Sequence, residues 1–340
     1  MTARSALAAA VAVIGALRAA PAAAQPGGPY APLVLSMPAG ARVLALGNVG
    51  VAGRDDDVIF YNPAQVAVAR GTSASYERYS ATSSGGTVSS VTRLANSAIA
   101  IGASVVEYRT RTSVLANEVS SIPFAMFPLD RGESLGSGGG DGVSAELTAG
   151  YARTLKGVRV GAAVKYAEDE VPAVRMQRAA FDVGVARDFG RDYALALAVQ
   201  NIGPSASISC VIHSETGHEN CAVPAEPYTG PGLRVPVNLP LRATLGGSFA
   251  HEVGPFDLLS TAGVSMLRTN VAIPAAGAEL GYSWLDGYDV DLRAGLRRPL
   301  AGEDAFTAGA GFTADRVSID YALETFTGGR VGHRIGLRIR

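Results

Sequence analysis

The feature that most constrains this chain is the alternation of apolar residues with polar or small ones along many short segments. In the clearest segment, 288–298, apolar residues occupy every second position: Tyr288, Val290, Leu292, Ala294 and Leu296. The positions between them hold Asp289, Asp291, Arg293, Gly295 and Arg297. A period of two places the two sets on opposite faces of a β-strand. Such a strand is either half buried in a water-soluble protein or part of a membrane barrel, with lipid outside and water inside.

Composition favours the barrel. Only 17% of the residues are charged and the mean hydropathy is +0.19, whereas about 25% charged residues is usual in soluble domains. After the N-terminal segment the sequence has no run of about 18 apolar residues, which excludes membrane-spanning helices. The 30 acidic and 29 basic residues argue against a nucleic-acid binder, which carries a basic excess. We therefore predict an all-β, transmembrane antiparallel β-barrel in the outer membrane of a diderm (Gram-negative) bacterium.

The first residues read as a targeting segment. Arg4 precedes an apolar stretch over residues 6–17, and Ala22, Ala23 and Ala24 form a small-residue cleavage site before Gln25. This order is typical of a secretory signal peptide. We predict a cleaved signal peptide over residues 1–24, an N-terminal hatch or plug in the lumen over 25–70, and the barrel over 71–340.

Alternation predicts fourteen strands, or twelve if the first two segments are not strands. The predicted ranges are 72–80, 87–94, 97–108, 143–155, 157–167, 177–189, 192–202, 240–250, 256–267, 274–284, 287–298, 305–314, 316–324 and 332–340. Every second connection is then short, as periplasmic turns of such barrels are, and the long loops 109–142, 168–176 and 203–239 share the other side.

One block resembles a known family. Residues 36–69 contain Gly40-Ala41-Arg42, Leu46-Gly47-Asn48, Asp55-Asp56-Asp57 and Tyr61-Asn62-Pro63-Ala64. This frame resembles the N-terminal signature of the PorV/PorQ family of FadL-like outer-membrane barrels, and the resemblance continues at 199–204, 239–242 and 333–337. Two positions depart from the usual pattern of such barrels, namely Gln65 for glycine and the non-aromatic last residue Arg340.

The resemblance implies a fourteen-stranded barrel with an N-terminal hatch, but not a single function. FadL proteins carry long-chain fatty acids and other hydrophobic molecules, and PorV-like proteins act with the type IX secretion system. The hatch either moves to open a path or seals the lumen permanently. The candidate hatch or gating residues are Gly47, Asn48, Asp55, Asp56, Asp57, Tyr61, Asn62 and Pro63.

Alternation also assigns charged residues to the lumen. The candidates are Arg293, Arg297, Arg334, Arg338, Asp289 and Asp291. They can form ion pairs with other strands and with the hatch, or the arginines can form a patch for an anionic headgroup such as a carboxylate.

The loop 203–239 holds both cysteines. We expect Cys210 and Cys221 to form a disulfide, as cysteine pairs of exported proteins usually do. The spacing of Cys210, His213, His218 and Cys221 makes them a weak zinc candidate, and we predict neither a metal nor a cofactor.

The sequence contains no H-E-x-x-H pattern, and its G-x-S-x-G match at 132–136 lies in the predicted loop 109–142 rather than between a strand and a helix, so we do not expect an enzyme. The leading hypothesis is a passive conduit for hydrophobic or amphipathic small molecules. The alternative is a secretion-system accessory or shuttle barrel of the PorV type, which binds proteins through its outer loops. The expected partners are outer-membrane lipids, the barrel-assembly machinery, and a hydrophobic ligand or secretion-system proteins, with no nucleic acid.

Overall fold

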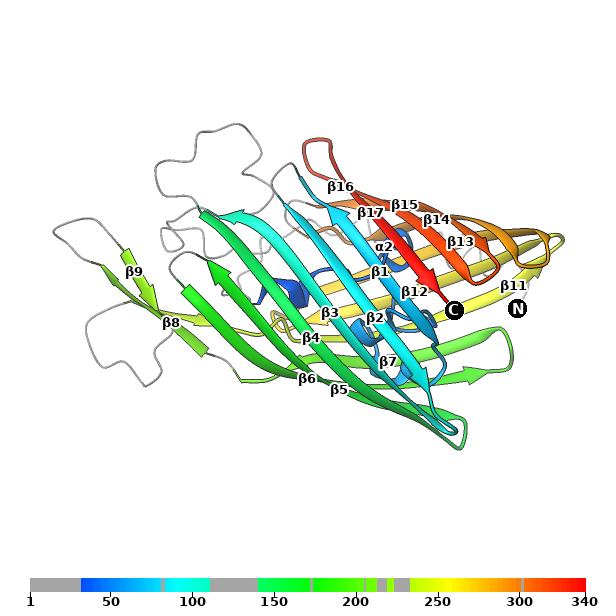
Figure 1. The fold of residues 1–340 in the computed structure, drawn as a ribbon, viewed down its shortest axis with the longest axis horizontal. Helices are drawn as coiled ribbons and strands as arrows, with labels where there is room; N and C mark the ends of the chain where they lie inside the picture. Colours follow the sequence, from blue (N-terminus) through cyan, green and yellow to red (C-terminus); the bar gives the residue numbers. More distant parts are fainter. Residues whose placement is uncertain are drawn as a thin grey trace.

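Fourteen antiparallel strands close into one barrel (Figure 1). The computed structural model describes residues 32–80, 83–110, 140–171, 174–204, 206–212, 219–222, 233–300 and 303–340. The barrel strands are β1 (Gly71–Arg78), β2 (Ser84–Arg93), β3 (Ser97–Thr110), β4 (Gly140–Leu155), β5 (Val158–Val171), β6 (Val174–Phe189), β7 (Tyr193–Ile202), β11 (Arg242–Val253), β12 (Phe256–Leu267), β13 (Ala272–Leu285), β14 (Tyr288–Arg297), β15 (Glu303–Ala314), β16 (Val317–Phe326) and β17 (Arg330–Ile339). β1 pairs with β17 and closes the ring. The predicted fold is confirmed, and the strand count is fourteen rather than twelve.

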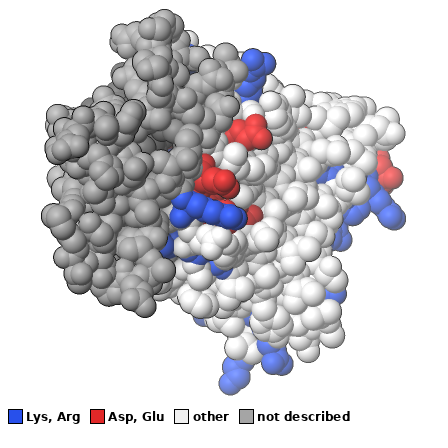
Figure 2. Space-filling model, turned by 60° about the vertical axis from the view of Figure 1, so that its left-hand side comes forward, with Lys and Arg blue, Asp and Glu red and all other residues white. Residues whose placement is uncertain are grey.

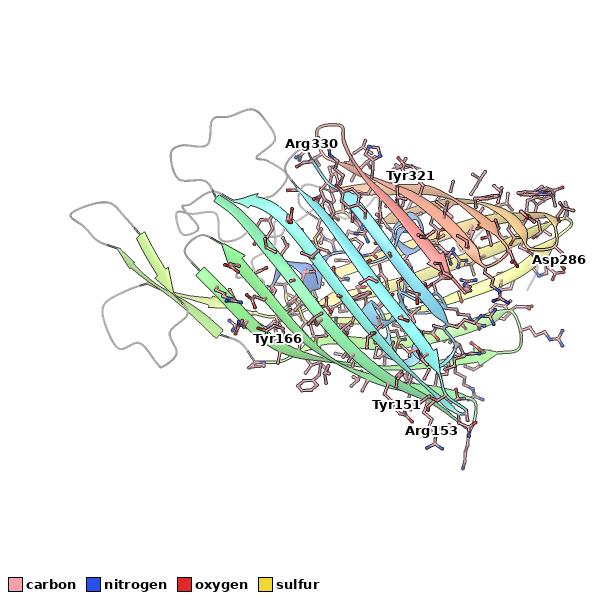
Figure 3. The ribbon with its side chains drawn as sticks, viewed as in Figure 1. Tyr151, Arg153, Tyr166, Asp286, Tyr321 and Arg330 are labelled. Carbon is pink, nitrogen blue, oxygen red and sulfur yellow. The ribbon has the colours of Figure 1, made fainter. Side chains whose placement is uncertain are left out.

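The alternation seen in the sequence is the alternation between the two faces of the wall. On β14, for example, Leu292 is 61% exposed on the outside, and its neighbour Arg293 is buried in the lumen. Large apolar side chains cover the exterior, and Tyr151, Tyr166 and Tyr321 stand on it in Figure 3. On the face shown in Figure 2, charged side chains gather toward the two ends of the barrel. Among the described residues, no helix is long and apolar enough to cross a membrane.

The connections differ between the two ends of the barrel. At one end, which we call the short-turn end, every connection has two or three residues: 94–96, 156–157, 190–192, 254–255, 286–287 and 315–316. At the other end, the long-loop end, lie 111–139 and 203–241. The predicted long loop 168–176 is wrong, because β5 and β6 continue into it and leave only 172–173 between them. Apolar and polar residues alternate less clearly over 168–176 than over the rest of β5 and β6, so the sequence did not reveal that both strands continue there.

A second, small sheet lies beyond the long-loop end of the barrel (Figure 1). It contains β8 (Ala206–Ile212), β9 (Glu219–Ala222) and β10 (Leu233–Val237) in the order β10-β8-β9. Our interpretation of 203–239 as a loop missed these strands, which are short and separated by residues without alternation.

The N-terminal segment 32–70 runs through the barrel lumen (blue in Figure 1) and is called the plug below. It contains four short helical turns: η1 (Leu33–Ser36), α2 (Ala41–Ala45), η2 (Val58–Phe60) and η3 (Pro63–Ala67). η1 packs near the long-loop ends of β3 to β6, and the plug leads into β1 at the short-turn end. The predicted signal peptide lies outside the described residues.

Candidate functional site

The plug fits closely against the barrel wall because the wall presents glycines to it. A Cβ atom added to any of eight lumenal glycines would overlap atoms of the plug: Gly102, Gly150, Gly161, Gly184, Gly246, Gly277, Gly295 and Gly309. Gly161, for instance, faces the backbone of Pro63, and Gly184 faces Asn62. The lumenal glycines therefore make room for the plug.

On the side of β3 to β6, the contact between plug and wall is apolar. Ile59 and Phe60 of η2 and Val66 of η3 pack with small wall residues in one buried cluster. The alanines that face them are Ala98, Ala100, Ala152 and Ala163. We call this contact the apolar side of the plug.

The Asn62-Pro63 motif forms the turn that holds η3 in place. The Asn62 side chain caps η3 by accepting a hydrogen bond from the Ala64 amide at 3.0 Å, and it donates to the Val51 carbonyl at 2.8 Å. Pro63 occupies the first turn of η3, where its missing N–H has no helical partner to lose. Asn62 thus joins two stretches of the plug, which explains why this residue type stands here.

Gly47 and Asn48 form a turn with left-handed backbone, at φ of 72° and 62°. The Gly47 amide donates to the Thr307 hydroxyl at 3.1 Å. A side chain at Gly47 would lie 2.9 Å from the carbonyl oxygens of Ala276 and Leu296 in the wall. Only glycine combines this conformation with so close an approach to the wall.

On the side of β13 to β17, ion pairs join the plug to the wall, and we call this the charged side. Arg42 of α2 binds Glu279 of β13 at 2.5 Å and Asp55 at 2.8 Å. Asp55 in turn binds Arg338 at 2.7 Å and Arg340 at 2.6 Å. Burial alone would raise the pKa of Asp55, but these three guanidinium groups outweigh it and hold that pKa well below its usual range.

The wall continues the charge network behind the plug. Arg293 binds Glu279 at 2.5 Å, Asp291 at 2.8 Å and Asp320 at 2.6 Å. Asp320 also forms an ion pair with Arg338 at 2.6 Å. Because every one of these charges has an opposite charge in contact, the network meets the main requirement for burying ions.

The four candidate arginines do not form a single patch. Arg297 pairs with Glu324 at 2.9 Å and Glu303 at 3.4 Å, and Arg334 pairs with Glu77. Of the two lumenal aspartates, Asp291 pairs with Arg293, and Asp289 accepts a hydrogen bond from the Ser283 hydroxyl. The arrangement is one of ion pairs within the wall and with the plug.

Asp56 and Asp57 lie beside this network but outside its pairing. Asp56 is fully buried, and neither of its carboxyl oxygens has a hydrogen-bond partner in the part of the chain that the structure describes. Oδ1 of Asp57 is likewise without a described partner. Burial, with the neighbouring charge of Asp55, raises the pKa of Asp56 to about 6 and that of Asp57 to about 8.

Tyr61 holds the start of α2. Its phenol oxygen accepts hydrogen bonds from the amides of Ala39, at 2.8 Å, and Gly40, at 3.2 Å. Burial and the nearby Asp57 raise the pKa of Tyr61 to about 12. The predicted hatch residues therefore all lie in the lumen within one connected plug.

A pocket of about 100 Å³ lies between the plug and the wall at the long-loop end. Met37 and Pro38 of the plug face Leu241, Ile273 and other apolar residues across it. Its remaining apolar lining comes from the strand ends and their connections: Pro240, Leu267, Ala275, Leu300 and Phe326.

Arg242 lines the same pocket. Among the described residues its guanidinium has no hydrogen-bond or ion-pair partner, unlike Arg297 nearby, which has two carboxylate partners. The pocket thus combines a largely apolar lining with a guanidinium that is not in direct contact with a carboxylate among the described residues, although Glu303 and Glu324 line the same pocket and the charge of Glu303 acts on Arg242. The sequence analysis missed this pocket, because its lining comes from segments far apart in the chain. The 239–242 motif was the signal that could have pointed to it.

The opposite wall carries a second buried charge group. Lys165 pairs with Asp182 at 3.0 Å and Glu146 at 3.3 Å. Asn201, in a bulge between β6 and β7 with φ of 59°, accepts a hydrogen bond from Lys165 and donates to the Leu35 carbonyl at 3.3 Å. This group ties the long-loop end of the plug to the wall.

In the small outer sheet, the backbone register sets Cys210 opposite Cys221. Directly opposed residues of antiparallel strands have Cα atoms about 4.5–5.5 Å apart, within the range of a disulfide. The pairing remains a prediction, since the side chains of both lie outside the described residues, as do His213 and His218 entirely. Among the described residues no group of three or more His, Cys, Asp and Glu is arranged to hold a metal ion.

Together these features define a class of protein: a fourteen-stranded barrel whose N-terminal segment fills the lumen. The chain matches no family model, and no curated protein matches it. Solved structures do. The toluene transporter TbuX of Ralstonia pickettii has a TM-score of 0.53 at 13% identity, over 88% of this chain and 98% of that one.

Two further channels give the same result. The toluene transporter TodX of Pseudomonas putida has a TM-score of 0.52 at 10% identity, covering 87% of this chain and 96% of its own. The monoaromatic hydrocarbon channel CymD has a TM-score of 0.56 at 9% identity, covering 88% and 97%. At such identities the likeness establishes the fold. It does not address the PorV/PorQ family.

Proposed function

We propose that this protein is a passive conduit of the outer membrane for hydrophobic or amphipathic small molecules. The observation that carries the proposal is the pocket at the long-loop end, which is bounded by the plug itself. A ligand in that pocket contacts Met37 and Pro38, so binding there can act directly on the segment that closes the lumen. The three similar structures are described as transporters or channels for toluene or monoaromatic hydrocarbons.

The pocket favours an amphiphile with an anionic headgroup. Its lining is largely apolar, which suits a hydrocarbon chain. Arg242 lies at the same pocket, and among the described residues no carboxylate is in direct contact with it, although the charge of Glu303 acts on it. A guanidinium binds a carboxylate through charge-assisted hydrogen bonds. Long-chain fatty acids combine both features, whereas toluene uses only the apolar lining.

The exterior supports the membrane location. A band of exposed apolar side chains surrounds the barrel, including Ile101, Leu147 and Leu292, each more than 60% exposed. Exposing this much apolar surface to water is unfavourable, while lipid accepts it. We orient the barrel with its short turns in the periplasm and its long loops outside the cell, as in other outer-membrane barrels. Ligand then enters from the long-loop end.

The test is uptake into liposomes that contain the refolded barrel. We expect uptake of a labelled long-chain fatty acid but not of a small sugar. Arg242→Gln should lower fatty-acid uptake about tenfold or more and leave uptake of toluene unchanged, because the lost interaction is with the carboxylate. Arg316→Gln, in a short turn on the opposite end, is the matched control. Failure of the wild type to take up either hydrophobic ligand would rule out the conduit.

A second candidate is an accessory barrel that binds a secreted protein. The small sheet supports it, because β9 and β10 are edge strands beyond the barrel, and a free strand edge can pair with an extended segment of another chain. Deleting residues 206–237 should abolish capture of such a partner and leave fatty-acid uptake intact. If the deletion stops uptake and no partner protein is lost, this candidate fails.

A further inference from the structure

Asp56 and Asp57 are buried carboxyl groups for which the ion-pair network has no cation left. The network contains four guanidinium groups, those of Arg42, Arg293, Arg338 and the more exposed Arg340, and four carboxylates, those of Asp55, Glu279, Asp291 and Asp320. These eight groups pair with one another, and their charges cancel. Ionised Asp56 and Asp57 would add two uncompensated negative charges to a buried site, which is strongly unfavourable.

The surroundings of Asp57 offer little else to stabilise an anion. Asp57 lines a cavity of about 20 Å³, with room for about one water molecule. The charged and titratable groups around the two carboxyls come from the plug, from β16, from β17 and from the residue after it: Arg42, Asp55, Tyr61, Asp320, Arg334, Arg338 and Arg340. The neighbouring strands β1 and β2 contribute only hydroxyl groups to the cavity, those of Ser73, Ser75 and Thr87. The arginines among these groups that lie nearest already bind Asp55.

We propose that the plug is a proton-dependent latch, in which docking against the charged side requires Asp56 and Asp57 to be protonated and release of the plug into water lets them ionise. The docked plug then binds protons that the released plug does not, so acid favours the closed barrel and mild alkali favours opening. This regulation rests on the conduit proposed above, since it concerns the segment that bounds the ligand pocket.

The direction follows from the difference between the two states. In water an aspartate has a pKa of about 4, whereas docking raises the pKa of Asp56 to about 6 and that of Asp57 to about 8. The stabilisation of docking by these protons is full below about pH 4 and is lost as pH rises through those raised values. Between pH 6 and 8, one proton at Asp57 changes the docking equilibrium by up to about tenfold per pH unit.

Amide hydrogen exchange of the full-length barrel in lipid nanodiscs tests the latch without any ligand. The reporters are plug amides with internal hydrogen bonds, such as Leu44 to Gly40 and Asn62 to Val58. Their rates are expressed as protection factors, so that the pH dependence of chemical exchange cancels. We expect plug protection to fall between pH 6 and 8 by up to about tenfold per unit, while amides of β4 and β5 stay unchanged as internal controls.

The double variant Asp56→Asn and Asp57→Asn mimics the protonated state. We expect plug protection in this variant to lose its pH dependence and to exceed that of the wild type at pH 8. If Asp56 and Asp57 had only a structural role, the substitutions would instead weaken plug protection. Asp286→Asn, in an exposed short turn labelled in Figure 3, should behave like the wild type. A flat wild-type profile, or an unchanged slope in the double variant, would overturn the latch. Because uptake is measured separately, a barrel with a pH-dependent plug but no uptake would refute the conduit and not the latch.

Discussion

The two sides of the plug meet the same barrel by different physical means. On the apolar side, η2 and η3 fill space that wall glycines and alanines leave open. On the charged side, α2 and Asp55 bind wall residues through ion pairs of 2.5–2.8 Å. Shape-matched apolar packing does not respond to pH, whereas the charged side carries the titratable groups. The comparison suggests that the apolar side positions the plug and the charged side is where its release is controlled.

The largest effect should come from removing the central anion of the charged side. Asp55→Asn leaves Arg42, Arg338 and Arg340 with less negative charge in a buried site. Breaking a buried pair in this way costs about 3–5 kcal/mol, so plug protection from hydrogen exchange should fall by at least about a hundredfold. The control is Asp188→Asn, because the Asp188 side chain is about one-third exposed and pairs with exposed Arg54 and buried Arg159. The loss there should be smaller than at Asp55. Equal effects of the two substitutions would remove the distinction between a buried and an exposed pair.

An intermediate effect should follow from filling space on the apolar side. Gly161→Leu puts a side chain where the Pro63 backbone lies, and overpacking of this kind costs about 1–3 kcal/mol. We expect the plug to shift and sugar to leak into liposomes at every pH, since no titratable group is involved. Ala162→Leu, the next residue on β5 and exposed on the outside, should leave the barrel sealed. A sealed Gly161→Leu barrel would show that the plug does not depend on this contact.

The smallest effect should come from the turn within the plug. Asn62→Ala removes the cap of η3 and the hydrogen bond to the Val51 carbonyl, at a cost of about 0.5–2 kcal/mol. Plug protection should fall by about three- to thirtyfold, with the pH dependence retained because Asp56 and Asp57 are untouched. Asn96→Ala in an exposed short turn is the matched control. A loss of pH dependence in Asn62→Ala would mean that the two sides of the plug are not separable.

The barrel was predictable because, along each barrel strand, residues that face the lumen alternate with residues that face outward. The alternation over 288–298, for example, predicts both the strand and the face on which Leu292 and Arg293 lie, and the structure confirms both. The same signal fails where a strand is short and lies outside the barrel wall, or where a barrel strand continues beyond its clearly alternating part. For this reason β8, β9 and β10 were missed, the end of β5 was placed too early and the start of β6 was placed too late.

The partners of lumenal residues could not be predicted in the same way. Alternation shows that Arg293 and Arg338 face inward, but only folding brings Arg338 to Asp55, 283 positions away in sequence. Likewise, Gly161 and Gly184 are recognisable as lumenal without any sign that Asn62 and Pro63 fill the space beside them. That Asp56 and Asp57 lie outside the ion pairs of the described residues depends on which charges surround them in space, and the order of residues along the chain does not give this.

Planar-bilayer conductance of the full chain and of a variant lacking residues 32–65 tests most directly whether the plug closes this barrel. We predict that the full chain stays essentially closed at pH 6, because the plug contacts both sides of the wall, and that the variant gives large, steady openings. The variant must first be shown to form a folded barrel by its strand protection from hydrogen exchange. Equal conductance of the two folded barrels would contradict the account.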